Sequence, residues 1–218
     1  MKINIHLVVN RAVQILLLYL FFTVMAESLF APILAVFITE SINGATLKTV
    51  GFALALYAIA KSIVQVPLAR YLDTHDGEKD DFYVLIVGAV FSALYPFAFL
   101  FVYEKWHLYL LEIFAGVSAA FLMAAYYSLF ARHVDKKSEG LEWSLFSVWG
   151  LTVSSAVGAA LGGWFVDLYG FAKLFLISGA INLVIIFILP MLYPLLGGQR
   201  PKALPPFEPM PHNPTLKK

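Results

Sequence analysis

The chain has 218 residues, of which 61% are apolar and only 13% are charged, and its formal net charge is +1. Soluble domains are about half apolar and about a quarter charged, so this composition excludes an ordinary soluble domain and indicates a membrane protein. The near-zero net charge disfavours nucleic acid as a partner, and the lack of cysteine in the sequence excludes disulfide frameworks and thiolate metal sites.

Six long apolar stretches follow one another along the chain, and each is long enough for a transmembrane helix. Hydrocarbon offers no hydrogen-bond partner to a free backbone amide, so stretches of this kind must be helical. The sequence therefore predicts an all-α integral membrane fold, a six-helix bundle within residues 1–196. The stretches cover about 12–38, 49–72, 83–103, 108–131, 143–166 and 171–196.

The first stretch carries Glu27 near its centre and Pro32 further on. Basic residues precede this stretch and residues 24–26 resemble a signal-peptidase site, so a cleaved leader is an alternative interpretation. Cleavage there would leave half a helix at the new terminus. We therefore favour one transmembrane helix that is bent at Pro32, where a backbone hydrogen bond is missing.

The second stretch carries Lys61 near its centre, at the same depth as Glu27. Ionisable groups at this depth cost about 2.5 to 3.5 kcal/mol on insertion scales and are normally kept for a purpose. If the two faces pack together, Glu27 and Lys61 can pair, either as a structural ion pair or as groups that respond to an arriving cation or proton. Tyr57 and Gln65 lie one turn to either side of Lys61 and extend the polar row.

The fourth stretch carries a third ionisable residue, Glu112, and the fourth and fifth stretches are rich in small residues. Small residues let helices approach closely in lipid, and such seams can also serve as sliding surfaces. On the fifth stretch these residues are Ser154, Gly158, Gly162 and Gly163. The histidines fall in loops or tails without a carboxylate at ligand spacing, so we expect no metal site, no cofactor and no enzyme active site.

The polar segments predict the orientation of the chain. Residues 197–218 are rich in proline and cannot bury enough apolar area to fold, which predicts a disordered tail. Lysine and arginine number eleven on the side that holds both termini and three on the opposite side. The positive-inside rule therefore predicts that both termini are cytoplasmic in a cell membrane.

The two halves of the chain share a weak repeat with a spacing of about 91 to 94 residues. Each unit would contain three helices, so consecutive units would have opposite orientations and form a 3+3 inverted repeat of the kind found in transporters. The matching segments are residues 68–73 with Gly77 and 88–89, and residues 161–167 with Gly170 and 179–180.

Residues 69–79, directly after the second stretch, read A-R-Y-L-D-T-H-D-G-E-K. This segment resembles the signature G-x-x-x-D-R-x-G-R-K that follows the second helix in the major facilitator superfamily. Asp73, Gly77 and Lys79 match, whereas an alanine replaces the first glycine, a threonine replaces the arginine, and one residue is inserted. The resemblance implies that Arg132, at the end of the fourth stretch, pairs with Asp73 as a gate latch.

Residues 154–163 are similar to the helix 5 signature G-x-x-x-G-P-x-x-G-G of antiporters in that family, with Ser154 and Ala159 replacing the first glycine and the proline. Glu112 stands where its drug antiporters often carry an arginine in helix 4, which argues against proton antiport by the usual arginine route. Over about residues 12–196 the chain resembles one six-helix half of this fold, most like the N-terminal half of drug/proton antiporter members.

The resemblance implies a secondary transporter that moves a small molecule by alternating access. Because the family has twelve helices, we expect a parallel homodimer, or a second six-helix subunit, to complete the pathway. Glu27 would be the coupling acid, and Glu27, Lys61 and Glu112 would line a shared cavity for the substrate and a coupling proton or cation. The alternative function is that of a non-transporting membrane protein, such as an accessory subunit or a transporter remnant.

Overall fold

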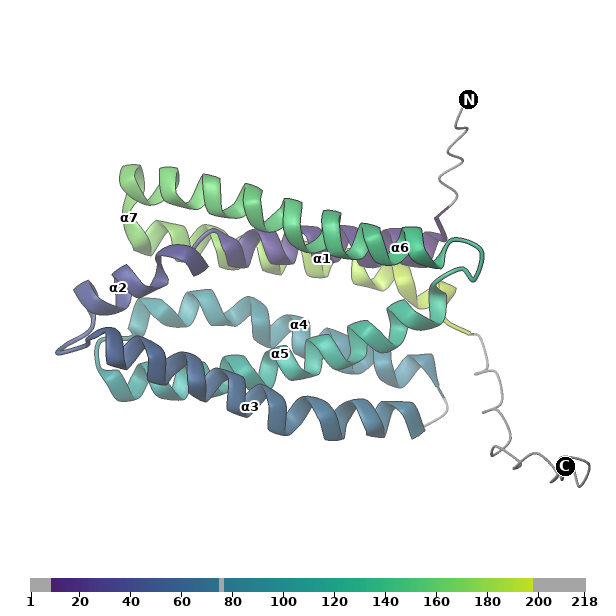
Figure 1. Cartoon of the computed structure of the whole chain (residues 1–218), viewed down its shortest axis with the longest axis horizontal. Coiled ribbons are helices and arrows are strands. Elements are labelled where there is room, and N and C mark those ends of the chain that lie inside the picture. The colour runs from purple at the N-terminus through teal and green to yellow at the C-terminus, as the bar shows by residue number, and fades with distance from the viewer. Residues whose placement is uncertain (1–8, 75–76, 198–218) are drawn as a thin grey trace, which may run out of the picture.

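The computed structural model describes residues 9–74 and 77–197, and every regular element in these ranges is a helix. The helices run along a common long axis, and the described chain begins and ends at the same end of the bundle (Figure 1). Five helical stretches of the described chain are long and apolar enough to cross a membrane, as the composition predicts. They are Arg11–Ser41, Leu47–Thr74, Glu78–Phe101, Lys105–His133 and Glu139–Leu195.

The first stretch is bent where the sequence predicts a bend. Helix α1 (Arg11–Ser28) leads into a 3₁₀ turn at Ala31–Ile33, and α2 (Leu34–Ser41) follows. Pro32 lies in the middle of this turn and has no N–H to donate to the helical ladder, so the regular α-helix ends before it and starts again after it.

The next three stretches form single helices. They are α3 (Leu47–Thr74), α4 (Glu78–Ala98, followed by a 3₁₀ turn at Phe99–Phe101) and α5 (Lys105–His133). These bounds agree with the second, third and fourth predicted helices and extend them by a few residues. Because α5 is longer than predicted, His107 and His133 lie in its terminal turns rather than in loops.

The fifth and sixth predicted helices form one helical stretch of 57 residues, which is the main departure from the prediction. It contains α6 (Glu139–Leu145), a π-helix at Phe146–Val153, α7 (Ser154–Ile186) and a 3₁₀ helix at Leu189–Leu195. A straight helix of this length would measure about 85 Å, far more than a bilayer of about 30 Å. The stretch is broken inside α7 at Gly170, where φ is 77° and the chain reverses direction (Figure 1). Glycine has no Cβ and adopts this left-handed conformation at little cost.

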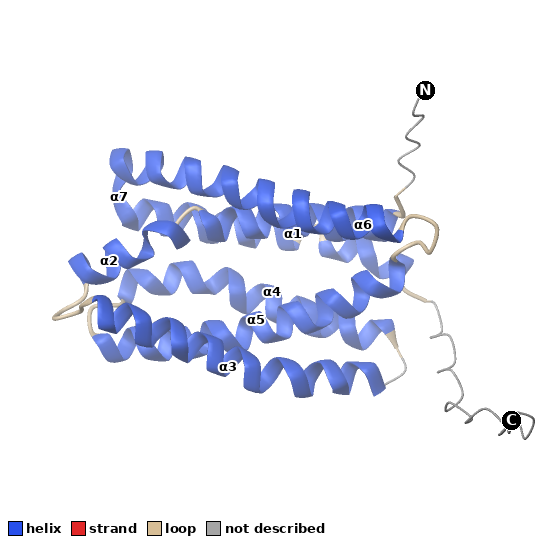
Figure 2. Cartoon of the chain, viewed as in Figure 1, coloured by secondary structure: helices blue, strands red, loops and turns tan. Residues whose placement is uncertain are grey.

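The helices form two layers, with α1 and α7 in one layer and α3, α4 and α5 in the other (Figure 2). Tight seams hold each layer together. A Cβ on Gly158 or Gly162 of α7 would collide with the α1 backbone at Met25 or Leu29, and a Cβ on Gly116 of α5 would collide with the α3 backbone at Tyr57. These contacts need glycine because a side chain would push the helices apart. The sequence also predicts a close helix contact at Gly163, but this is wrong, since a Cβ there would meet nothing within 4 Å.

The buried core is divided along the length of the bundle. One apolar cluster surrounds Leu16 and Tyr126 near the end that holds both termini of the described chain, and a second cluster surrounds Phe37 and Phe99 near the other end. Six of the buried polar side chains lie at the level between these clusters, on α1, α4, α5 and the second arm of α7, which is the part of that helix after Gly170. They are Thr23, Ser92, Glu112, Ser118, Ser178 and Asn182.

Candidate functional site

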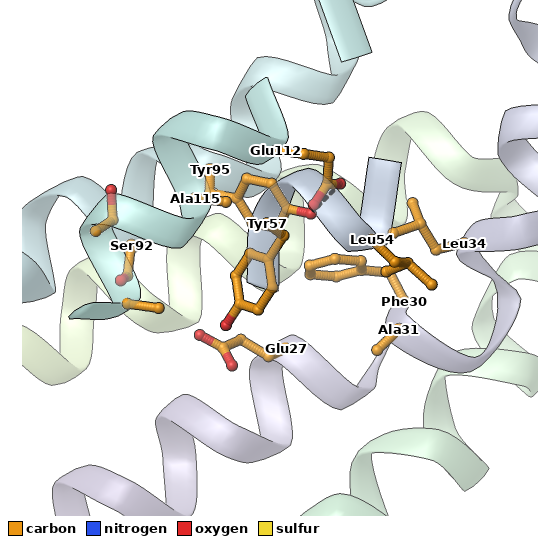
Figure 3. A pocket seen from close by; sticks show the side chains of 12 residues that line it. Glu27, Phe30, Ala31, Leu34, Leu54, Tyr57, Ser92, Tyr95, Glu112 and Ala115 are labelled. Atoms are coloured by element: carbon orange, nitrogen blue, oxygen red, sulfur yellow. Dashed lines mark hydrogen bonds between the residues drawn. The ribbon is translucent and has the colours of Figure 1, made fainter. Parts of the chain in front are cut away.

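A pocket of about 190 Å³ lies at this polar level, between α1, α3, α4 and α5. Figure 3 shows that carboxylates and aromatic rings project into it from all four helices. A volume of this size has room for a small organic molecule or several waters. The polar lining residues are Glu27, Tyr57, Ser92, Tyr95, Glu112 and Ser118.

Glu27 reaches the pocket from the last turn of α1, just before the helix is interrupted at Pro32. Its carboxylate and the hydroxyl of Tyr57 on α3 point toward one another (Figure 3). The sequence predicts Glu27 from its depth and Tyr57 from its place one turn from Lys61, and both line the pocket. An acid at this position faces the space in which a cation or proton would arrive.

Glu112 is the more deeply buried of the two acids, with 2% of its surface exposed. The hydroxyl of Tyr95 on α4 donates a hydrogen bond of 2.9 Å to its Oε1 (Figure 3). A hydrogen bond to a carboxylate is roughly twice as strong as one between neutral groups, so Tyr95 orients Glu112 and offsets part of its burial cost. Sequence reasoning missed Tyr95, Ser92 and Ser118, because tyrosines and serines in apolar stretches give no signal of which face they occupy.

Lys61 and Gln65 lie on α3, both half-buried, and neither lines the pocket. The expected ion pair with Glu27 is not formed: among the described residues, no salt bridge joins Lys61 to Glu27. The Lys61 ammonium instead lies 5.8 Å from the centre of the Tyr57 ring, in a cation–π contact. The reason is the helix pairing, since α1 packs mainly on α7 and α3 packs mainly on α5.

A second polar cluster ties α4 to α5 at the end of the bundle where the described chain begins and ends. Arg132 Nη1 lies 2.9 Å from Asp81 Oδ2, and the hydroxyl of Ser128 donates a 2.8 Å hydrogen bond to the same oxygen. The expectation that Arg132 pairs with Asp73 is therefore wrong. Asp73 is exposed near the end of α3, whereas Asp81, in the first turn of α4, packs directly against the last turns of α5.

The other predicted gating residues flank this cluster. Gly77 is the N-cap of α4, and the ammonium of exposed Lys79 lies 5.6 Å from the centre of the Tyr193 ring. Ser154 of the helix 5 motif is fully buried, and its hydroxyl donates to the carbonyl of Gly150 in the preceding π-helix. The predicted tail at 197–218 lies outside the described residues except for Gly197, whose N–H donates to Glu78 Oε2 at 2.9 Å. Within the described ranges, no three metal-ligating side chains lie together.

Comparison with known families identifies the chain. The sequence model of the Major Facilitator Superfamily matches residues 16–216, which is most of the chain and includes every described helix beyond the start of α1. The chain belongs to the major facilitator superfamily. The resemblance to this superfamily is thereby confirmed, and the chain is a multi-pass membrane protein of a transporter family. No curated protein matches it.

Proposed function

We propose that this superfamily member transports a small organic cation by alternating access and that Glu27 is its coupling acid. The pocket carries the proposal: two carboxylates, Glu27 and Glu112, face a cavity that is also lined by the rings of Phe30, Tyr57 and Tyr95. Carboxylates attract a positive charge, and aromatic faces bind both the charge and the apolar body of such a molecule.

The packing supports a 3+3 inverted repeat. Counting the two arms of the last stretch, 139–169 and 171–195, gives six crossings. A 3+3 repeat relates the first crossing to the fourth, the second to the fifth and the third to the sixth. The seam between α1 and the first arm then corresponds to the seam between α5 and α3, and both seams are tight glycine contacts. The repeat also relates the third crossing, α4, to the sixth, the second arm, so these two should contact each other at the centre. Phe97 of α4 packs closely against Gly179 of the second arm.

A pathway needs a second bundle to face this one, and we propose a second copy of the chain. Six crossings give every copy the same orientation, so two copies can form a parallel pair with their pockets facing each other. The Arg132–Asp81 pair would brace the gate within each copy, while Gly77, Lys79 and exposed Asp73 would lie at the gate between copies. We place both termini in the cytoplasm and the protein in the cell membrane, as the lysine and arginine distribution indicates.

Transport can be measured with the full chain in proteoliposomes. The probe is benzyltrimethylammonium, a permanent cation with one ring, and neopentylbenzene is its uncharged counterpart in binding assays. We expect the cation to be bound and moved under a pH gradient, and we expect Glu27→Gln to abolish the coupling. Glu40→Gln is the matched control, because Glu40 is an exposed acid on α2 away from the pocket.

Two outcomes would contradict the proposal. Undiminished, ion-coupled uptake by Glu27→Gln would remove Glu27 from the mechanism, and equal binding of the charged and uncharged probes would remove the preference for cations. Crosslinking or mass measurement in native-like lipid tests the assembly, for which we expect a dimer. A stable monomer that moves no solute would favour the alternative of a non-transporting membrane protein.

A further inference from the structure

The interface between α1 and the second arm of α7 contains a buried polar site outside the pocket lining. The hydroxyl of Ser178 donates a 2.7 Å hydrogen bond to the carbonyl of Ala26, which sets the register of the two antiparallel helices. One turn from this bond along each helix, toward the end that holds both termini, lie Thr23 and Asn182. Their exposed fractions are 2% and 3%.

Both side chains carry a polar atom without a hydrogen-bond partner among the described residues. These atoms are Oγ1 of Thr23 and Nδ2 of Asn182. A helical hydroxyl usually bonds the carbonyl one turn earlier, as Ser118 does with Phe114, but Thr23 does not. Buried polar groups without partners are rare and costly, and both of these lie one turn from the Ser178–Ala26 bond, so a single small polar molecule could serve both.

Glu27 is the nearest acid in the sequence, four residues after Thr23 on the same face of α1. The Glu27 carboxylate points toward Tyr57 (Figure 3), and a rotation of this side chain toward the N-terminus, the direction in which helical side chains lean, would aim it at Thr23. The hydroxyl of Tyr19, one turn further along, lies close enough to interact with that of Thr23. Tyr19, Thr23 and Glu27 thus form a polar row that passes through apolar surroundings.

We propose that Thr23 and Asn182 hold a buried water through which Glu27 exchanges its proton with the end of the bundle that carries both termini. The proposal rests on the proposed function for the role of Glu27, but not for the water site. Water fits because it donates and accepts, and buried waters typically make two to four hydrogen bonds to groups that otherwise lack partners. The Asn182 amide donates to the water oxygen and holds it in place.

The proton transfer balances along this row. The Glu27 carboxyl gives its proton to the water, the water gives one of its own to the Thr23 hydroxyl, and that hydroxyl gives its own to the Tyr19 hydroxyl. Tyr19 then gives its original proton to bulk water that enters when this end of the bundle opens. Each intermediate group ends with as many protons as it had, Glu27 becomes a carboxylate, and one proton moves along the row. The apolar cluster around Leu16 and Tyr126 closes the row beyond Tyr19, so release needs this end of the bundle to open.

Several other ionisable groups lie on the helices around Glu27. They are Tyr57 and Lys61 on α3, Tyr95 on α4 and Glu112 on α5. The second arm of α7 contributes Ser178 and Asn182 at this level. Apart from Glu27, which belongs to both, the relay residues therefore differ from the substrate-facing residues, and substitutions on the two sides can be compared.

A thermodynamic cycle tests the water site by thermal unfolding of the full chain. Thr23→Val and Asn182→Leu each remove one partner of the water and leave the other unsatisfied, so we expect each to lower the Tm by about 2 to 4 °C. The double variant replaces the site with an apolar contact, and its Tm should recover toward that of the wild type. Strictly additive losses would show that the two groups share no water and would overturn the proposal.

Transport in proteoliposomes tests the relay. Thr23→Val should reduce the rate of proton-coupled benzyltrimethylammonium transport at least tenfold without weakening binding of the cation, while Thr23→Ser, which keeps the hydroxyl, should retain the wild-type rate. Unchanged coupling in Thr23→Val would overturn the relay.

If the wild type moves no cation, the proposed function fails, and the thermodynamic cycle still decides the water site. Should the valine variant not fold, a high-resolution experimental map decides the site: water density between Thr23 and Asn182 supports the proposal, and a dry interface overturns it.

Discussion

Tyr95 is the residue on which the buried acid of the pocket depends. Its hydroxyl donates to Glu112, which is almost fully buried. Tyr95→Phe keeps the ring and removes this bond, so we expect the free energy of unfolding to fall by about 1.5 to 3 kcal/mol and benzyltrimethylammonium binding to weaken. Chemical unfolding and equilibrium binding in detergent measure both effects. The control is Tyr127→Phe on exposed Tyr127, for which we expect no change, and equal effects from the two variants would refute the role of Tyr95.

Arg132 is the residue that tests the corrected latch. Arg132→Ala removes the cation that lies 2.9 Å from Asp81, a carboxylate with 1% of its side chain exposed, so we expect a loss of about 3 to 5 kcal/mol in stability. Asp81→Asn combined with Arg132→Gln removes both charges and should recover most of this loss. Asp73→Ala should change stability by less than about 0.5 kcal/mol, because Asp73 is exposed. If substitution of Asp73 lowered stability more than substitution of Asp81, the unfolding curves would instead support a pair between Arg132 and Asp73.

At the scale of elements, neighbouring glycines on α7 have opposite packing environments. A Cβ on Gly162 would collide with the backbone of α1 at Leu29, whereas one on Gly163 would meet nothing within 4 Å. We expect Gly162→Ala to lower stability by about 1 to 3 kcal/mol, because backbone on both sides prevents relaxation. Gly163→Ala should be neutral or slightly stabilising, because alanine is the better helix former. Thermal unfolding of the two variants shows whether Gly162 lies in a packing seam while Gly163 faces away from it. Equal stabilities of Gly162→Ala and Gly163→Ala would contradict the seam.

At the scale of the whole molecule, the orientation can be tested directly because the sequence contains no cysteine. Ser41→Cys and Asp135→Cys place single thiols at exposed positions near opposite ends of the bundle. We expect a membrane-impermeant maleimide to label the thiol at position 41 in intact cells and the thiol at position 135 only after permeabilisation, since the positive-inside rule places the termini in the cytoplasm. The reverse labelling pattern would invert the proposed topology.

The sequence was sufficient for features that depend on one segment at a time. A run of apolar residues must become a helix in lipid, and Pro32 must interrupt the ladder, whatever surrounds them. Depth is also local, so Glu27 and Glu112 could be assigned to the middle of the bundle, but depth alone did not separate them from Lys61, which does not line the pocket. The helix count was less secure, since Gly170 reverses the chain within one continuous helical stretch.

Only the tertiary structure decides which side chains contact each other, because these contacts depend on the rotation of each helix about its axis and on which helices pack together. One residue along a helix is a rotation of about 100°, which is why Gly162 is in a seam and Gly163 is not. The pairing of α1 with α7 and of α3 with α5 separates Lys61 from Glu27. The contact between α4 and α5 brings Arg132 next to Asp81 and Glu112 next to Tyr95. In lipid these choices follow from close packing between specific surfaces rather than from hydrophobicity, which every helix shares.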